Sequence, residues 1–96
     1  MKVRNIVRTA AIVSRCNEDS KFSHFCFLSL TKFLKHDWGD TCEEDAKLND
    51  ERVDADGQIL AVYKYGREKD TKIWIVADDD EHKEAKVVTI LFPEDY

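Results

Sequence analysis

The chain has 96 residues, of which 43% are hydrophobic and 36% charged, and its formal net charge is −5. This length and composition predict one globular domain over residues 1–96 and exclude a disordered chain. The negative charge weighs against direct nucleic-acid binding, and no stretch reaches the roughly 20 apolar residues of a membrane span, so we expect a cytoplasmic protein.

The first predicted element is a strand near residues 3–8, because residues 3–13 are rich in β-branched side chains with polar interruptions. A turn or an irregular segment is expected after it. Residues 17–20, Asn-Glu-Asp-Ser, then combine a capping side chain with acids suited to a first helical turn. These signals predict that a helix begins at this point.

The segment 21–36 is predicted to be a long helix. Its apolar residues recur with a period of about 3.6 residues. The face that they form comprises Phe22, Phe25, Cys26, Leu30 and Phe33. Phe27, Leu28 and Leu34 widen this apolar stripe, so one edge of it should meet a second helix or a partner. Gly39 is expected to end the helix in the left-handed conformation.

A second, short helix is predicted over residues 42–51. Thr41 and Glu44 match the capping box, in which two side chains satisfy the exposed N–H groups of a helix start. Few residues of this helix are apolar, so it should lie on the surface with its acids in water. Residues 54–57, Asp-Ala-Asp-Gly, have the chemistry of a turn.

Three further strands are predicted, over residues 58–64, 72–77 and 86–92. The links between them are short and polar, which is typical of an antiparallel meander, and the long helix can bury its aromatic face on that sheet. The sequence therefore predicts the α+β class. We expect an antiparallel sheet of three to four strands, packed by one long and one short helix, in the order β-α-α-β-β-β.

Several segments of the chain resemble a known family. They are Asp-Trp-Gly-Asp at 37–40, Glu-Asp at 44–45, Asn-Asp at 49–50, Gly57 before a strand that reaches Tyr63, Lys-Ile-Trp-Ile-Val at 72–76, and Thr-Ile-Leu-Phe-Pro-Glu-Asp-Tyr at 89–96. Together they make residues 20–96 similar to short proteins carried by bacterial plasmids, phages and integrated elements. The resemblance implies a mobile genetic element as the setting, with no common activity, cofactor or active site. Small proteins of such elements include counter-defence factors such as anti-CRISPR inhibitors, which bind and block a host nuclease complex.

The cysteines and histidines favour neither catalysis nor metal binding. They are Cys16, Cys26, Cys42, His24, His36 and His82. The cysteines are odd in number and form no CxxC pair, so buried free thiols are expected, with a disulfide or metal role as the alternative. The histidines have no local partner for acid–base chemistry. The acidic loop 78–82 could ligate a hard cation, but it lacks the ligand spacing of an EF-hand. We expect no metal and no cofactor.

Charge is unevenly distributed along the chain. Residues 1–36 hold seven basic and two acidic residues, whereas residues 37–56 hold two basic and nine acidic residues. The acidic segment could imitate a phosphate backbone in a basic groove, or it could be a solvated face near a basic helix. Aromatic residues could likewise anchor a partner or belong to the core. The residues predicted to contact a partner are Asp37, Trp38, Asp40, Glu43, Glu44, Asp50, Glu51, Trp74 and Tyr96.

These observations predict a non-enzymatic protein-binding factor from a mobile genetic element, an anti-CRISPR-like inhibitor that occupies a nucleic-acid-binding surface of a host protein. The expected partner is a host protein, such as a nucleic-acid-binding defence complex, rather than a nucleic acid or a membrane. The alternative is a homodimeric regulatory or accessory module of a plasmid or phage, which pairs through an exposed sheet face around Trp74. A small hydrolase or metal-dependent enzyme requires a pocket that gathers a His or Cys with two carboxylates.

Overall fold

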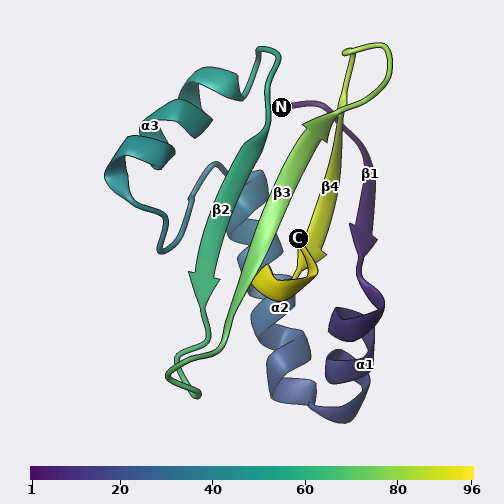
Figure 1. Ribbon diagram of the computed structural model, residues 1–96, viewed down its shortest axis with the longest axis vertical. Coiled ribbons are helices and arrows are strands. Elements are labelled where there is room, and N and C mark those ends of the chain that lie inside the picture. The colour runs from purple at the N-terminus through teal and green to yellow at the C-terminus, as the bar shows by residue number, and fades with distance from the viewer.

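The computed structural model describes residues 1–96 as a four-stranded sheet with three α-helices and a C-terminal 3₁₀ helix (Figure 1). The predicted α+β class is confirmed. The elements in chain order are β1 (Val3–Arg8), α1 (Ala10–Glu18), α2 (Ser20–Leu34), α3 (Glu43–Arg52), β2 (Ile59–Lys64), β3 (Lys72–Asp79), β4 (Lys86–Leu91) and η1 (Pro93–Asp95). None of the helices has the length and hydrophobicity needed to cross a membrane.

The sheet is mixed rather than purely antiparallel. Its strand order is β1-β4-β3-β2, in which β3 is antiparallel to both of its neighbours and β1 is parallel to β4. The predicted meander of the last three strands is therefore confirmed, whereas the prediction of a wholly antiparallel sheet was wrong for β1. Helices rather than a hairpin separate β1 from the other strands, so its direction is not constrained to be antiparallel.

Helix α1 was not predicted. Residues 10–18 were expected to begin as a turn or irregular segment, but Thr9 caps a helix there, and its side chain accepts a hydrogen bond from Ile12 N. Ile12 and Cys16, one helical turn apart, are buried. The β-branched Ile12 and Val13 favoured a strand in the sequence and obscured this pattern. The element order is therefore β-α-α-α-β-β-β.

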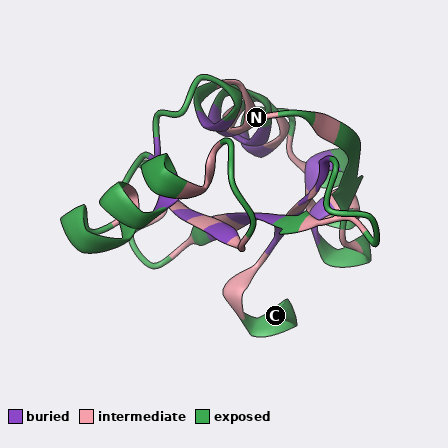
Figure 2. Ribbon diagram, turned by 90° about the horizontal axis from the view of Figure 1, so that it is seen from above, coloured by how far each residue is buried: buried purple, intermediate pink, exposed green.

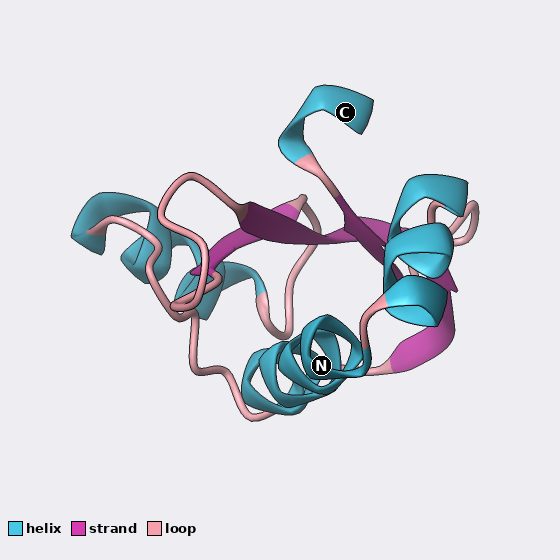
Figure 3. Ribbon diagram, turned by 90° about the horizontal axis from the view of Figure 1, so that it is seen from below, coloured by secondary structure: helices cyan, strands magenta, loops and turns pink.

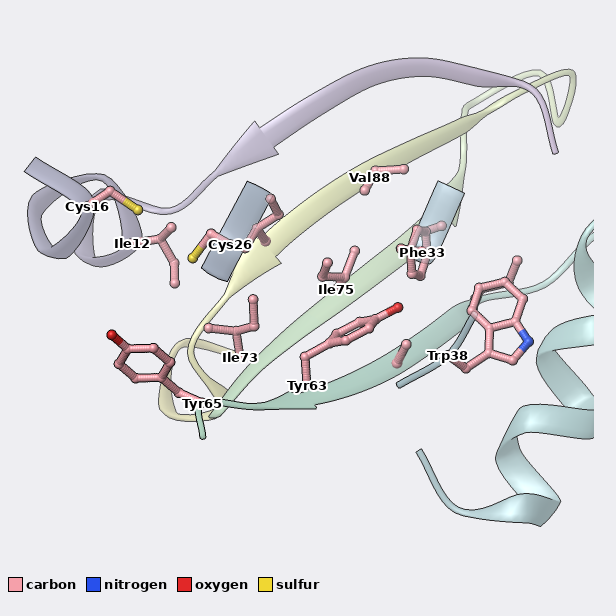
Figure 4. Packing of buried hydrophobic residues seen from close by; sticks show 14 of the residues in the cluster. Ile12, Cys16, Cys26, Phe33, Trp38, Tyr63, Tyr65, Ile73, Ile75 and Val88 are labelled. Atoms are coloured by element: carbon pink, nitrogen blue, oxygen red, sulfur yellow. The ribbon is translucent and has the colours of Figure 1, made fainter. Parts of the chain in front are cut away.

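Helix α2 covers one face of the sheet, and the C-terminal turn lies on the other (Figures 2 and 3). Asp19 is its N-cap and accepts hydrogen bonds from the N–H groups of Lys21 and Phe22, which confirms the predicted helix start. Phe22 and Phe33 have no exposed surface, and the Phe22 ring lies 5.4 Å from that of Tyr65. The predicted apolar face of this helix therefore packs into the core of the protein (Figure 4).

The turn after α2 differs from the prediction. His36, rather than Gly39, adopts the left-handed conformation at the end of the helix, with a φ of 65°. Gly39 also has a positive φ, of 61°, and a Cβ atom at this position would lie 2.4 Å from Cδ1 of Tyr63. Glycine is therefore required here so that the backbone can approach β2 closely.

The backbone N–H and C=O groups on the outer edge of β2 form hydrogen bonds with the segment before α3. Asp40 N donates to Val62 O (2.8 Å), and Val62 N donates to Thr41 Oγ1 (2.9 Å). The Asp40 carboxylate accepts a further hydrogen bond from Lys64 N (2.8 Å). Thr41 therefore does not form the predicted capping box, because its hydroxyl is engaged by β2. The N-cap of α3 is Cys42, which makes no capping hydrogen bond through its side chain.

Helix α3 completes the coverage of β2 through Asn49, which is 3% exposed. Its amide nitrogen donates to Leu60 O (3.0 Å), and its amide oxygen accepts from Leu60 N (3.3 Å). One side chain thus replaces the backbone of a neighbouring strand. We call Asp40, Thr41 and Asn49 the edge clamp. A sheet edge covered in this way is closed to pairing with another chain.

Replacing Asn49 with Ala should lower the free energy of unfolding by about 2 kcal/mol, because the N–H and C=O of Leu60 would lose their partners in a buried site. Urea denaturation measures the change. Lys47→Ala, on the solvent side of the same helix, is the matched control and should change stability by less than about 0.5 kcal/mol. Equal effects of the two substitutions would contradict the role given to Asn49.

Candidate partner-binding surfaces

The structure places Trp38 in the core, where it connects α2 to α3. The residue is 6% exposed, and its ring packs edge-on against Phe33 with 5.3 Å between the ring centroids. Its indole Nε1 donates to Asp50 Oδ1 (2.8 Å), and Figure 4 shows this nitrogen directed toward α3. The indole N–H of Trp38 and one carboxylate oxygen of Asp50 are therefore engaged with each other, although Asp50 itself is exposed.

Asp37 and Asp40 also make contacts within the chain. Asp37 Oδ1 accepts from Gly39 N (3.1 Å), and its carbonyl oxygen accepts from the Tyr63 hydroxyl (2.7 Å). Burial, reinforced by the nearby carboxylates of Asp37 and Asp40, raises the pKa of Tyr63, so the phenol stays protonated and keeps donating. Asp40 belongs to the edge clamp. Both aspartates therefore shape the chain where it meets β2.

Glu43, Glu44 and Glu51 form an exposed group on α3, which we call the acidic face. Its only ion pair joins Glu43 to Lys47 at 3.9 Å, and it contributes little because both side chains are at least 75% exposed. Glu44 and Glu51 are two helical turns apart, which places them on the same side of the helix. The first-turn acids also interact favourably with the helix dipole. The acidic face is thus held by its helix and remains open to solvent.

Trp74 and Tyr96 contact each other on the sheet face away from α2. Their ring centroids lie 5.5 Å apart at an interplanar angle of 68°, and the Tyr96 hydroxyl donates to Gln58 Oε1 (3.0 Å). Val76 and Leu91, on the same face, are 2% and 5% exposed. The Trp74 Nε1 atom is buried without a hydrogen-bond partner. The C-terminus therefore covers part of this face, while Tyr96 itself is 65% exposed.

The cysteines occupy two different environments. Cys16 and Cys26 are buried free thiols, as predicted, whereas Cys42 is free but exposed. Burial, together with the neighbouring Cys16, raises the pKa of Cys26 to about 12, so this thiol stays protonated. The exposed histidines are His24, His36 and His82. No group of three or more His, Cys, Asp and Glu side chains is arranged to hold a metal ion.

The acidic residues at the end of β3 and directly after it accept hydrogen bonds within the chain. Asp79 Oδ1 accepts from Lys86 Nζ (2.8 Å), and its Oδ2 accepts from Gly57 N (2.7 Å). These two hydrogen bonds lower the pKa of Asp79. Asp80 accepts hydrogen bonds from backbone N–H groups of its own loop. The carboxylates therefore organise the loops at this end of the sheet.

Lys86 is an organising residue that reasoning from the sequence missed. It is 4% exposed, and its Nζ also donates to Ala55 O (3.1 Å) and Gly57 O (2.9 Å). All three ammonium protons therefore have acceptors. The available signal was a lysine at the first position of an apolar strand. Its acceptors in the loop before β2 lie 29 and 31 residues away, so no local pattern revealed them.

Asp50→Ala should destabilise the protein by about 1–3 kcal/mol, because the buried indole N–H of Trp38 would lose its acceptor. The neighbouring Glu51→Ala is the matched control and should change stability by less than about 0.5 kcal/mol. Thermal unfolding followed by tryptophan fluorescence compares the two variants. If both behave like the wild type, the contact between Trp38 and Asp50 does not hold α3 in place.

Comparison with known proteins gave no match: no family model, no curated protein and no solved structure is matched by this chain. The resemblance to plasmid-carried and phage-carried proteins therefore stays a prediction. Several residues that carry it, among them Trp38, Gly39 and Asp40, have the structural roles described above.

Proposed function

We propose that this protein is a non-enzymatic binding factor that presents the acidic face of α3 to a basic groove of a nucleic-acid-binding partner. The supporting observation is that the acidic residues of 37–56 fall into two groups, one hydrogen-bonded within the chain and one facing solvent. Asp37, Asp40 and Asp50 are exposed, but one carboxylate oxygen of each accepts a hydrogen bond inside the chain. The acidic face, in contrast, points its carboxylates into solvent, where they can interact with a partner's cations.

The anchoring of α3 supports the same proposal. Asn49 holds the inner side of the helix to β2, Asp50 holds it to Trp38, and Arg52 Nη1 donates to Gln58 O (2.8 Å) at its C-terminal end. The helix therefore presents its charges in a fixed arrangement, which reduces the entropy lost on binding. Glu44 and Glu51 are separated by about 10 Å along the axis, comparable with roughly three nucleotide steps of one DNA strand.

The biological form of this proposal is a counter-defence inhibitor carried by a mobile genetic element and acting in the host cytoplasm. The resemblance of residues 37–40, 72–76 and 89–96 to plasmid-carried and phage-carried proteins supports that setting. Inhibition would follow from occupancy, because a partner whose cationic groove is filled by α3 cannot bind its nucleic acid. The partner is then a host protein, such as a nuclease complex.

A homodimer that pairs through the sheet face around Trp74 is the second candidate. The observation in its favour is the Tyr96 ring, which packs against Trp74 on this face and is itself 65% exposed. Exposed aromatic rings are frequent anchors of protein interfaces, so this ring could pack against a second copy. Light scattering coupled to size exclusion distinguishes the candidates, because a stable dimer that protects Trp74 favours this one.

The double substitution Glu44→Lys and Glu51→Lys should weaken partner binding by roughly a hundredfold, because it reverses the exposed charges and leaves the anchoring contacts intact. It should lower the free energy of unfolding by at most about 1 kcal/mol, through the lost interaction of Glu44 with the helix dipole. The matched control, Glu18→Lys with Glu84→Lys, makes the same charge change elsewhere on the surface and should bind like the wild type. Affinity purification from the host, followed by measured binding to the captured protein, tests both variants. Capture of no nucleic-acid-binding protein, or equal binding by the two double variants, would refute the proposal.

A further inference from the structure

One outer edge of the sheet is covered by other parts of the chain, and the other is not. β2 and β1 are the terminal strands of the order β1-β4-β3-β2. The edge clamp covers β2, whereas β1 pairs only with β4 and is exposed at five of its six residues. An uncovered strand edge is a template on which another extended chain can pair.

The backbone of β1 has hydrogen-bonding groups directed away from the sheet. Thr9 N donates inward to Ile90 O (3.1 Å). Because successive N–H groups of a strand point to alternate sides, those of Ile6 and Arg8 point outward. The Ile6 N–H is bonded only to the side chain of the preceding Asn5 (3.0 Å), a contact on the surface that a pairing strand can replace.

The side chains along this edge define the chemistry of a complementary strand. Residues 1–17 contain four basic residues and no acid. Arg8 is exposed and unpaired, and Arg4 reaches Asp80 at 3.8 Å while its side chain remains 59% exposed. Ile6 and Val7 are 43% and 41% exposed, one on each face of the strand. The edge therefore combines unbalanced positive charge with apolar surface.

We propose that the outer edge of β1 binds an extended acidic segment of a partner protein, which adds a fifth strand to the sheet. Carboxylates on one face of that segment pair with Arg8, and apolar side chains on its other face pack against Val7. A second copy of this chain is a poor occupant, because two β1 strands would bring their basic side chains together. This surface lies across the sheet from α3 (Figure 1), so it is independent of the acidic face.

The experiment uses a labelled peptide as long as β1, six residues, in which Glu and Val alternate. Titration into the whole protein, followed by backbone amide NMR, should shift the resonances of β1 and slow hydrogen exchange at Arg8. Arg8→Glu should weaken binding roughly tenfold, because it places like charges opposite each other. Lys69→Glu, an equal charge change in the exposed loop between β2 and β3, should bind like the wild type.

Three outcomes would overturn the proposal. The first is no binding, or equal binding of a peptide in which Lys replaces Glu. The second is a stronger effect of a single-stranded oligonucleotide on the β1 resonances, which would make nucleic acid the occupant. The third is a dimer by light scattering whose β1 amides are protected without any peptide, which would make a second copy the occupant. None of these outcomes involves α3, so none of them tests the function proposed for the acidic face.

Discussion

The closed outer edge of β2 is the interaction on which the rest of the structure depends. A terminal strand has a row of unpaired N–H and C=O groups, and here Asp40, Thr41 and Asn49 supply their partners. This arrangement requires the chain after α2 to lie directly against β2. Gly39 permits that approach, because any side chain would collide with the Tyr63 ring. Helix α3 is consequently held beside the sheet with one side facing β2 and the other facing solvent.

The position of α3 determines which of its acidic residues contact the rest of the protein and which face solvent. Asp50 accepts the indole N–H of Trp38, whereas the exposed side chains of Glu44 and Glu51 make no hydrogen bond or ion pair within the chain and form part of the proposed binding face. The opposite edge of the sheet differs in coverage and in charge, since β1 is uncovered and its side chains include the basic residues Arg4 and Arg8. A small protein with a closed acidic edge and an open basic edge can contact two different partners, or two regions of one partner, without rearrangement. Both proposed surfaces lie on secondary-structure elements held by the rest of the fold.

Prediction from the sequence succeeded where the signal lies within one element. Helix α2 could be predicted because its buried residues, such as Phe22 and Phe33, recur at helical spacing. The parallel pairing of β1 could not, because its partner strand lies at the other end of the chain. The same limit applies to the candidate site. The residue type shows that Asp40 is an acceptor, but its donor, Lys64 N, is 24 residues away. Thr41 resembled a helix cap for this reason, although its hydroxyl is engaged by Val62.

Amide hydrogen exchange in β2 is the most direct test of the edge clamp. We expect the N–H groups of Leu60, Val62 and Lys64 to exchange as slowly as those of the central strand β3, because Asn49, Thr41 and Asp40 accept from them. The outward N–H of Arg8, on the uncovered edge, should exchange much faster. Exchange at the three β2 positions as fast as at Arg8 would show that the edge is open, and would contradict both the placement of α3 and the function proposed for its acidic face.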